Sequence, residues 1–256
     1  MQKTLIKLLV TLSTILIVLF PILSYGKHAS ILNEVRVYSQ SVEQFEKGTG
    51  NKTLGEIYAN GLVLAEKLVD NMRKWTEESN VLESLSAEDY MFVEKEMKGF
   101  FVTRHEIVNV SPDMNSFKKM AILGGTQEDK NFFYFMAELY PYGIWPTFIQ
   151  EQTSFSGCDI FGDGILTNLY IETESPKFKK ITNVKYKEEV NDIREGIKNR
   201  LSEDGGCACG GADTVIKELI LFIESMPKAS FITDVKRQLS VVKSGKSTIR
   251  FFCQTG

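Results

Sequence analysis

Residues 186–226 have the sequence YKEEVNDIREGIKNRLSEDGGCACGGADTVIKELILFIESM. Two glycine pairs, at 205–206 and 210–211, enclose a Cys-Ala-Cys triplet in this stretch. Paired glycines are typical of a break between helices, because glycine has a low helix propensity and readily adopts turn conformations. We therefore predict helices over residues 186–201 and 212–226, joined by a loop that carries Cys207 and Cys209.

Helical patterns also occur on both sides of this stretch. Between residues 53 and about 78, apolar residues recur mostly at steps of three and four, which is the spacing of an amphipathic helix. Ser86 and Asp89 resemble a capping box, and Pro112 suits the first turn of a helix that stops at Gly124. The predicted helices in these flanking regions cover residues 53–78, 86–101, 111–124, 130–139 and 232–242.

Few segments favour strands. Residues 165–171 are a candidate, and residues 248–253 alternate apolar and polar side chains. Residues 27–51 form a mixed segment without a clear assignment. No internal repeat or linker interrupts the chain after the leader, so we predict a mainly α fold. It is a single multi-helix domain over residues 27–256, with one or two short central or C-terminal strands.

The first 26 residues are typical of a cleavable signal peptide. Lys3 and Lys7 precede an apolar run, and small residues at Ser24 and Gly26 fit a cut after Gly26. An uncleaved membrane anchor is the alternative, because the run of 18 residues from Leu8 to Tyr25 is near the lower limit for a span. We predict a periplasmic or secreted protein with no membrane span after cleavage.

Composition excludes several classes of protein. The chain has 256 residues, of which 43% are hydrophobic and 25% charged, with 6 prolines, so collagen-like and wholly disordered chains are excluded. The net charge of −3 gives no support for nucleic-acid binding. Without the leader, 28 basic and 33 acidic side chains remain, which gives −5.

The four cysteines are the strongest chemical signal in the sequence: Cys158, Cys207, Cys209 and Cys253. An even number of cysteines in an exported chain predicts two disulfides. Cys207 and Cys209 could bridge each other only with strain, so each is expected to bond to Cys158 or Cys253, with either pairing open. Separations such as the 49 residues from Cys158 to Cys207 give about 4 kcal/mol per bridge in the loop-entropy estimate.

Two other uses of these cysteines remain open. The Cys-x-Cys pair precedes a predicted helix, whose dipole would favour thiolates and a redox site, although thioredoxin-type chemistry uses Cys-x-x-Cys. Four cysteines could also bind zinc, but their spacings match no common zinc module. We predict structural disulfides, with no metal and no cofactor.

Aromatic residues are concentrated between Phe132 and Phe161. With Glu138 and Glu151 nearby, this stretch could form a glycan-binding or glycan-cleaving groove with two carboxylates for acid–base catalysis. Aromatic side chains also bury the largest areas per residue, which favours a core in this region. No spacing fixes the distance between the two carboxylates, so no acid or base is assigned.

Other candidate sites are weaker. Residues 159–164 have the sequence DIFGDG, but this segment lacks the alternating oxygen ligands and terminal glutamate of an EF-hand loop. His105 could pair with Cys158 as a nucleophile, but a disulfide at Cys158 excludes this pairing. Residues 227–256 carry six basic side chains against Asp234, a pattern of a solvated helix face or of a surface for anionic lipid or an acidic partner.

No short catalytic fingerprint occurs in the sequence. We therefore predict an exported cell-envelope protein that acts as a binding or interaction module and has a protein partner in the envelope. No nucleic-acid partner is expected, and the sequence gives no signal for an oligomeric state. The alternatives are an envelope hydrolase acting on glycan or peptide bonds, and a thiol oxidoreductase using the Cys-x-Cys pair.

Overall fold

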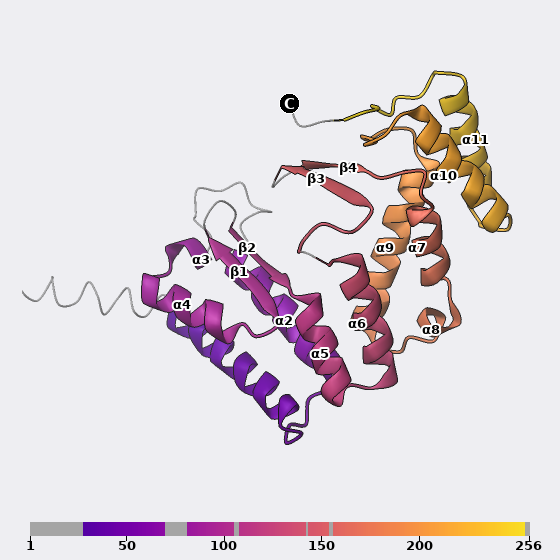
Figure 1. Cartoon of the computed structure of the whole chain (residues 1–256). Coiled ribbons are helices and arrows are strands. Elements are labelled where there is room, and N and C mark those ends of the chain that lie inside the picture. Colours follow the sequence, from indigo (N-terminus) through magenta and orange to yellow (C-terminus); the bar gives the residue numbers. More distant parts are fainter. Residues whose placement is uncertain (1–27, 70–80, 105–107, 142, 154–155, 254–256) are drawn as a thin grey trace, which may run out of the picture. The chain divides into compact units, whose positions relative to one another are not determined.

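The computed structural model describes residues 28–69, 81–104, 108–141, 143–153 and 156–253 (Figure 1). These residues are mainly helical, which confirms the predicted mainly α class, but they form four short strands rather than the one or two that the sequence predicted. The predicted signal peptide and His105 lie outside the described residues.

Helices account for most of the described chain. A first helix covers residues 28–46. The other helices are α2 (Leu54–Val69), α3 (Val81–Ser84), α4 (Ala87–Glu96), α5 (Met114–Gly124), α6 (Gln127–Leu139), α7 (Ile165–Thr173), α8 (Pro176–Lys179), α9 (Val184–Ser202), α10 (Ala212–Ser225) and α11 (Ile232–Lys243).

Four short strands form two antiparallel hairpins among the described residues. Strand β1 (Phe100–Arg104) pairs with β2 (Val108–Pro112), in a register that places Val102 opposite Val110. Strand β3 (Ile149–Thr153) pairs with β4 (Ser156–Asp159), in a register that places Gln150 opposite Cys158.

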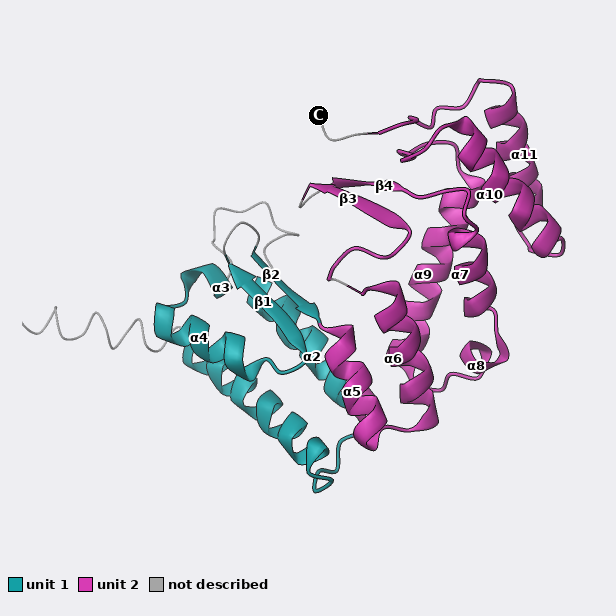
Figure 2. Ribbon diagram, viewed as in Figure 1, with its two compact units in different colours: residues 1–52, 56–112 teal, residues 53–55, 113–256 magenta. Residues whose placement is uncertain are grey.

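The chain divides into two compact units (Figure 2). Unit 1 holds the described residues up to 52 and those of 56–112, and unit 2 holds residues 53–55 and those from 113 onward. The sequence indicated no linker at this boundary. The single domain over residues 27–256 stays a prediction, and each unit is described by itself.

Unit 1 buries one face of its first helix. Val35, Tyr38 and Val42 are buried at spacings of three and four residues, which is the stripe of an amphipathic helix. The ring of Phe100 meets the ring of Tyr38 edge-on, with 6.0 Å between centroids. Gly61 of α2 leaves room for both rings, because a Cβ atom there would collide with Phe100.

Unit 2 has an aromatic core. The rings of Phe132 and Tyr186 stack with 4.0 Å between centroids, and Phe117 stacks on Phe133 at 5.1 Å. Within the aromatic-rich stretch, the fully or nearly fully buried rings are Phe132, Phe133, Phe135, Phe148 and Phe161. This stretch therefore supplies packing, as aromatic side chains do when they are buried.

Two neighbouring carboxylates join helices in this core. Asp129 accepts hydrogen bonds from the backbone N–H and hydroxyl of Thr126 at the start of α6, and from the hydroxyl of Tyr186 at 2.6 Å. Glu128 accepts bonds from the backbone N–H groups of Thr182 and Asn183 just before α9. Each carboxylate thus satisfies amide donors that a helix start leaves without intrahelical partners.

Four predicted segments need correction. The helix predicted from residue 111 begins at Met114, because residues up to Pro112 form β2. Residues 165–171 form helix α7 rather than a strand, because Glu218 of α10 accepts hydrogen bonds from amide groups at its start. The predicted strand at 248–253 is reduced to an isolated bridge at Arg250. The helix predicted to run to Phe101 ends at Glu96, and Gly99, at φ +82°, turns the chain into β1.

Candidate functional site

The four cysteines form two disulfides in unit 2. Cys158 of β4 is bonded to Cys209, with 5.0 Å between their Cα atoms, and Cys207 is bonded to Cys253, with 5.9 Å. The prediction of disulfide bonds is confirmed, and the pairing that the sequence left open is now specified. Cys207 and Cys209 are not bonded to each other, and all four thiols are consumed by the bridges.

Backbone hydrogen bonds join the Cys-x-Cys loop to β4. The Asp159 N–H donates to the Cys207 carbonyl at 2.8 Å, and the Cys209 N–H donates to the Asp159 carbonyl at 3.0 Å. This is a parallel bridge between Asp159 and Ala208. The Cys158–Cys209 disulfide crosses between the same two segments.

A second bridge joins the loop to the C-terminal segment. The Arg250 N–H donates to the Gly206 carbonyl at 3.1 Å, and the Ala208 N–H donates to the Arg250 carbonyl at 2.8 Å. The Cys253 N–H donates to the Ala208 carbonyl at 3.1 Å. We call β4, residues 206–211 and residues 248–253 together the cysteine site.

The structure explains why two positions of the loop are glycine. Gly206 has φ +82°, a left-handed conformation that side chains rarely adopt. Gly211, the N-cap of α10, lies under the ring of Phe252, and a Cβ atom there would be 2.7 Å from Cζ of that ring. The glycine pairs thus allow the tight approach that two adjacent crosslinks require.

Arg200 supports the cysteine site from α9. Its Nε atom donates to Oδ1 of Asp159 at 2.6 Å, and its Nη1 atom donates to the Gly196 carbonyl at 2.9 Å. The guanidinium also lies over the ring of Phe148, 4.8 Å from the centroid. This placement neutralises the Asp159 carboxylate beside the disulfide and holds it in one orientation.

Asp204 anchors the beginning of the C-terminal segment. Its carboxylate accepts hydrogen bonds from the Ser247 hydroxyl at 2.5 Å, the Thr248 N–H at 2.8 Å and the Gln238 amide at 3.1 Å. Burial acts to raise the pKa of Asp204, but these hydrogen bonds outweigh it and lower the pKa to about 2.

This lowered pKa predicts a pH-dependent contribution to stability. The contribution is fully present above the usual pKa of 3.8 and is lost as the pH falls toward 2, where the folded-state carboxylate is protonated too. We expect Asp204→Asn to lower the free energy of unfolding at pH 7, because the amide accepts the hydrogen bonds less well than the carboxylate. The loss should be only about 1 kcal/mol, because Asp204 is exposed and solvent screens its charge. Urea unfolding at pH 7, 4 and 2 checks this.

The adjacent exposed carboxylate provides the control for Asp204. Glu203→Gln should change stability by less than about 0.5 kcal/mol at each pH, as surface substitutions usually do. A constant difference between Asp204→Asn and the unsubstituted protein from pH 7 to pH 2 would contradict the assignment.

Phe252 is the most unusual residue of the cysteine site. Its side chain is 69% exposed, and its φ of +53° is the only positive φ of a non-glycine residue among those described. Its N–H donates to the Gly210 carbonyl at 3.0 Å, and Cys253 follows directly with its disulfide. A phenyl ring is therefore held at the surface on a backbone conformation that costs free energy.

Basic side chains surround the C-terminal segment in the sequence. Arg237 pairs with Asp234 at 3.1 Å. The remaining exposed basic residues of this region form no ion pair with another described residue: Lys228, Lys236, Lys243, Lys246 and Arg250. The chain from α11 to Phe252 thus carries several basic side chains without an ion pair among the described residues, and it ends in an exposed ring.

The carboxylates considered for hydrolysis lie on different elements. Glu138 is exposed on α6 and Glu151 is exposed on β3. A hollow of about 360 Å³ lies in unit 1, lined by Val37, Val63 and other residues of that unit, and includes neither carboxylate. The sequence proposal of an acid–base pair gains no supporting geometry from these positions.

The DIFGDG segment is a glycine turn whose amides are already used. Gly162 and Gly164 have φ of +98° and +74°, and their N–H groups donate to the Glu218 carboxylate at 3.1 and 2.9 Å. Among the residues described, no cluster of three or more histidine, cysteine or acidic side chains could hold a metal ion.

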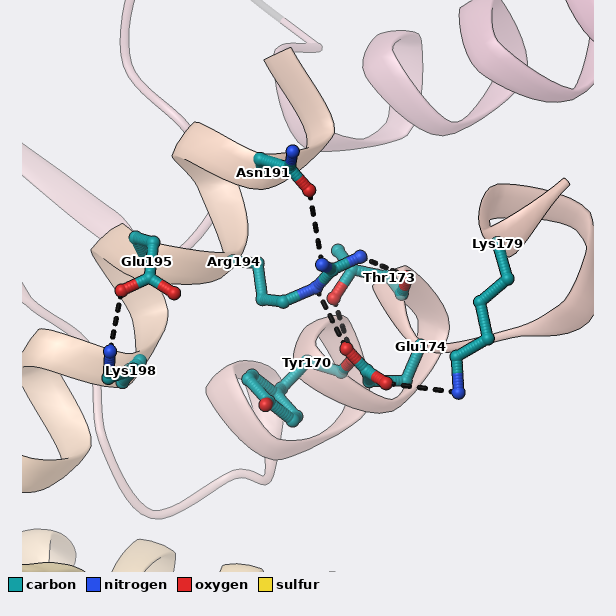
Figure 3. Close-up of polar contacts among 8 residues, drawn as sticks. All are labelled: Tyr170, Thr173, Glu174, Lys179, Asn191, Arg194, Glu195 and Lys198. Atoms are coloured by element: carbon teal, nitrogen blue, oxygen red, sulfur yellow. Dashed lines mark hydrogen bonds and ion pairs between the residues drawn. The ribbon is translucent and has the colours of Figure 1, made fainter. Parts of the chain in front are cut away.

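A second polar cluster joins α7 to α9 (Figure 3). Arg194 donates through Nη2 to the Thr173 carbonyl at 2.9 Å, and its Nε lies 2.9 Å from Glu174 Oε1. Glu174 also pairs with Lys179 at 3.1 Å. Burial, followed by the charge of Glu174, raises the pKa of Tyr170 above its usual value. Arg194 thus ties α9 to the end of α7 through one hydrogen bond and one ion pair.

Sequence reasoning identified the cysteines but missed Arg200, Asp204 and Phe252. Arg200 bonds to Asp159, 41 residues away in the sequence, and Asp204 bonds to residues more than 30 positions away. No local sequence pattern reveals such contacts. For Phe252, the only available signal was an aromatic residue next to a cysteine predicted to be crosslinked.

No known family model, curated protein or solved structure matches the chain. In the part of the chain that the structure covers, none of the helices combines the length and apolar character needed to cross a membrane.

Proposed function

We propose that this chain is an exported binding module of the cell envelope, and that Phe252 and the basic residues near it contact an acidic protein partner. The observation that carries the proposal is the Phe252 ring, which is held at the surface by a strained backbone and a neighbouring disulfide. The signal peptide and the envelope location are part of the proposal.

The disulfides support the proposed location in an oxidising compartment. Two bridges indicate an oxidising environment, because cytosolic thiols are kept reduced in most organisms. The predicted leader would deliver the chain to such an environment.

The geometry of Phe252 favours binding over packing. A left-handed backbone at a non-glycine residue persists only when the surrounding structure enforces it, and such strain is concentrated at functional sites. An aromatic ring fixed before binding loses little conformational entropy when a partner covers it. The Cys207–Cys253 bridge and the bond from Phe252 to Gly210 provide this fixation.

Charge favours an acidic protein over a lipid surface. Lys243, Lys246 and Arg250 precede Phe252 and form no ion pair with another described residue, so they complement acidic side chains around an apolar pocket. An anionic membrane would also face the rest of the molecule, which carries −10, because the chain without the leader has a net charge of −5 and residues 227–256 contribute +5. An acidic patch on a protein partner can face the basic segment alone, so the attraction is not offset by the negative charge of the rest of the chain.

Affinity capture with two matched variants tests the proposal. The oxidised protein without its leader is immobilised and exposed to envelope extract, together with Phe252→Ala and, as control, Phe101→Ala. Phe101 is a 47% exposed phenylalanine of unit 1. We expect a stoichiometric protein partner whose binding weakens at least tenfold in Phe252→Ala, as for an interface hot spot, and is unchanged in Phe101→Ala.

Other outcomes contradict the proposal. Equal capture by both variants would remove Phe252 from the contact surface. Binding of anionic vesicles without any protein partner would replace the proposed partner with a lipid surface. Thermal unfolding of both variants confirms that lost capture does not come from lost structure.

A further inference from the structure

We propose that the Cys207–Cys253 disulfide is a thiol-exchange site, which takes up anionic low-molecular-weight thiols at Cys253, whereas the Cys158–Cys209 disulfide resists exchange. This inference does not depend on the proposed protein partner. It rests on the different surroundings of the two bridges and on the charge beside Cys253.

Access differs between the two disulfides. Cys158 is 1% exposed, whereas Cys207, Cys209 and Cys253 are each partly exposed. Exchange begins when a thiolate attacks one sulfur and the other sulfur leaves as a thiolate. Attack on Cys158 is blocked by burial. Attack on Cys209 would force a negative charge onto buried Cys158, which desolvation disfavours.

The outer bridge has neither obstacle. Attack on Cys253 expels Cys207 as a thiolate that remains in contact with solvent, because Cys207 is partly exposed. Cys253 is partly exposed and directly follows the exposed Phe252, and its sulfur lies 3.3 Å from the Arg250 carbonyl oxygen. An attacking thiolate can therefore reach Cys253, and the thiolate that leaves on Cys207 can contact solvent.

Charge near Cys253 selects among attacking thiols. Arg250 is exposed, lies two residues from Phe252, and forms no ion pair with another described residue. Lys246, seven residues before Cys253 in the sequence, is likewise exposed and without an ion pair in the described chain. Their field raises the local concentration of an anionic thiol and lowers that of a cationic thiol, and salt weakens both effects.

Exchange at Cys253 forms one disulfide bond and breaks another. The incoming thiolate sulfur forms a bond to the Cys253 sulfur, the Cys207–Cys253 bond breaks, and its electron pair leaves on Cys207, which takes a proton from solvent. The product is a mixed disulfide at Cys253 and a free thiol at Cys207. A second thiol of the same class can reduce the mixed disulfide, giving the Cys253 thiol and the oxidised form of the small thiol.

The C-terminal segment remains attached after exchange. The bonds from Arg250 to Gly206 and Ala208 and the bonds from Ser247 and Thr248 to Asp204 do not involve sulfur. The change is therefore local to the end of the segment, and the helices are expected to keep their structure.

The test compares three small thiols on the full oxidised chain without any substitution: 3-mercaptopropionate, 2-mercaptoethanol and cysteamine, at equal thiolate concentration. Adducts and free thiols are mapped by alkylation and peptide mass spectrometry. We expect an adduct at Cys253 and a free Cys207 while Cys158–Cys209 stays intact. Each rate is divided by the rate of the same thiol with a small neutral disulfide, because the intrinsic nucleophilicity of a thiolate depends on its pKa. At low salt this normalised rate should fall about threefold from the anionic to the neutral thiol and again to the cationic thiol.

Charge-reversal variants distinguish electrostatic attraction of the anionic thiol from simple exposure of Cys253. Arg250→Glu should remove or invert the preference for 3-mercaptopropionate, whereas Lys95→Glu, a change at an exposed lysine of unit 1, should leave it unchanged. Reduction of Cys158–Cys209 before or together with Cys207–Cys253 would overturn the inference. So would an adduct on another cysteine, or equal normalised rates for the three thiols at low salt.

Discussion

Replacing Cys158 and Cys209 together by alanine is expected to lower the free energy of unfolding by about 4 kcal/mol. The disulfide closes a loop with a sequence separation of 51 residues, and the loop-entropy estimate for that length gives this magnitude. The same bridge joins β4 to the Cys-x-Cys loop, where the Asp159 N–H donates to the Cys207 carbonyl and the Cys209 N–H donates to the Asp159 carbonyl. Urea unfolding of the oxidised proteins measures the loss.

Reduction supplies the control for this prediction. With both disulfides reduced, the unsubstituted protein and the double variant should unfold within about 1 kcal/mol of each other, because only two thiol groups then distinguish them. A loss below 1 kcal/mol for the oxidised double variant would show that the crosslink does not stabilise the fold.

Glu218→Ala is expected to cost about 3–5 kcal/mol. The Glu218 carboxylate is completely buried on α10 and accepts bonds from the amides of Gly162 and Gly164 and from the amide and hydroxyl of Thr167. Removing it leaves these buried donors at the start of α7 without an acceptor. Thermal and urea unfolding, with circular dichroism to follow helix content, measure the effect.

Two further substitutions are controls for Glu218→Ala. Glu224→Ala changes an exposed carboxylate on the same helix and should cost less than about 0.5 kcal/mol. Glu218→Gln keeps one acceptor oxygen and should cost about half as much as Glu218→Ala. Equal stabilities of Glu218→Ala and Glu224→Ala would show that Glu218 does not hold α7.

Helices with local signals could be predicted from the sequence. Residues 212–226 are bounded by glycines and proline, and α10 ends one residue before the predicted limit. The end of α5 at Gly124 agrees with the prediction, whereas its start does not, because Ser111 and Pro112 lie in β2 and Asp113 caps the helix. In these segments, caps and breakers act within a few residues, so the sequence contains the information needed.

Segments that depend on distant residues could not be predicted. Residues 165–171 contain several strand-favouring side chains, but Glu218, more than 50 residues away, supplies acceptors for the start of a helix. The first helix was missed because its apolar stripe of Val35, Tyr38 and Val42 alternates with other apolar residues such as Val37. There the tertiary contacts, and not the local preference, decide the structure.

The cysteine site was predicted in part. An even number of cysteines and the glycine pairs indicated crosslinks at the loop, but the pairing depends on the position of β4, which the sequence did not reveal. The charge of residues 227–256 was visible in the sequence. Its association with an exposed ring was not, because the exposure of Phe252 follows from its backbone conformation and its contact with Gly211.

Non-reducing peptide mapping tests the crosslinked C-terminal segment most directly. Thiols are blocked by alkylation during purification of the native protein, and proteolytic peptides are then identified by mass spectrometry. We predict one crosslink between Cys158 and Cys209, a second between Cys207 and Cys253, and no alkylated cysteine. Four alkylated cysteines, or a crosslink between Cys207 and Cys209, would contradict the site and the compartment inferred from it.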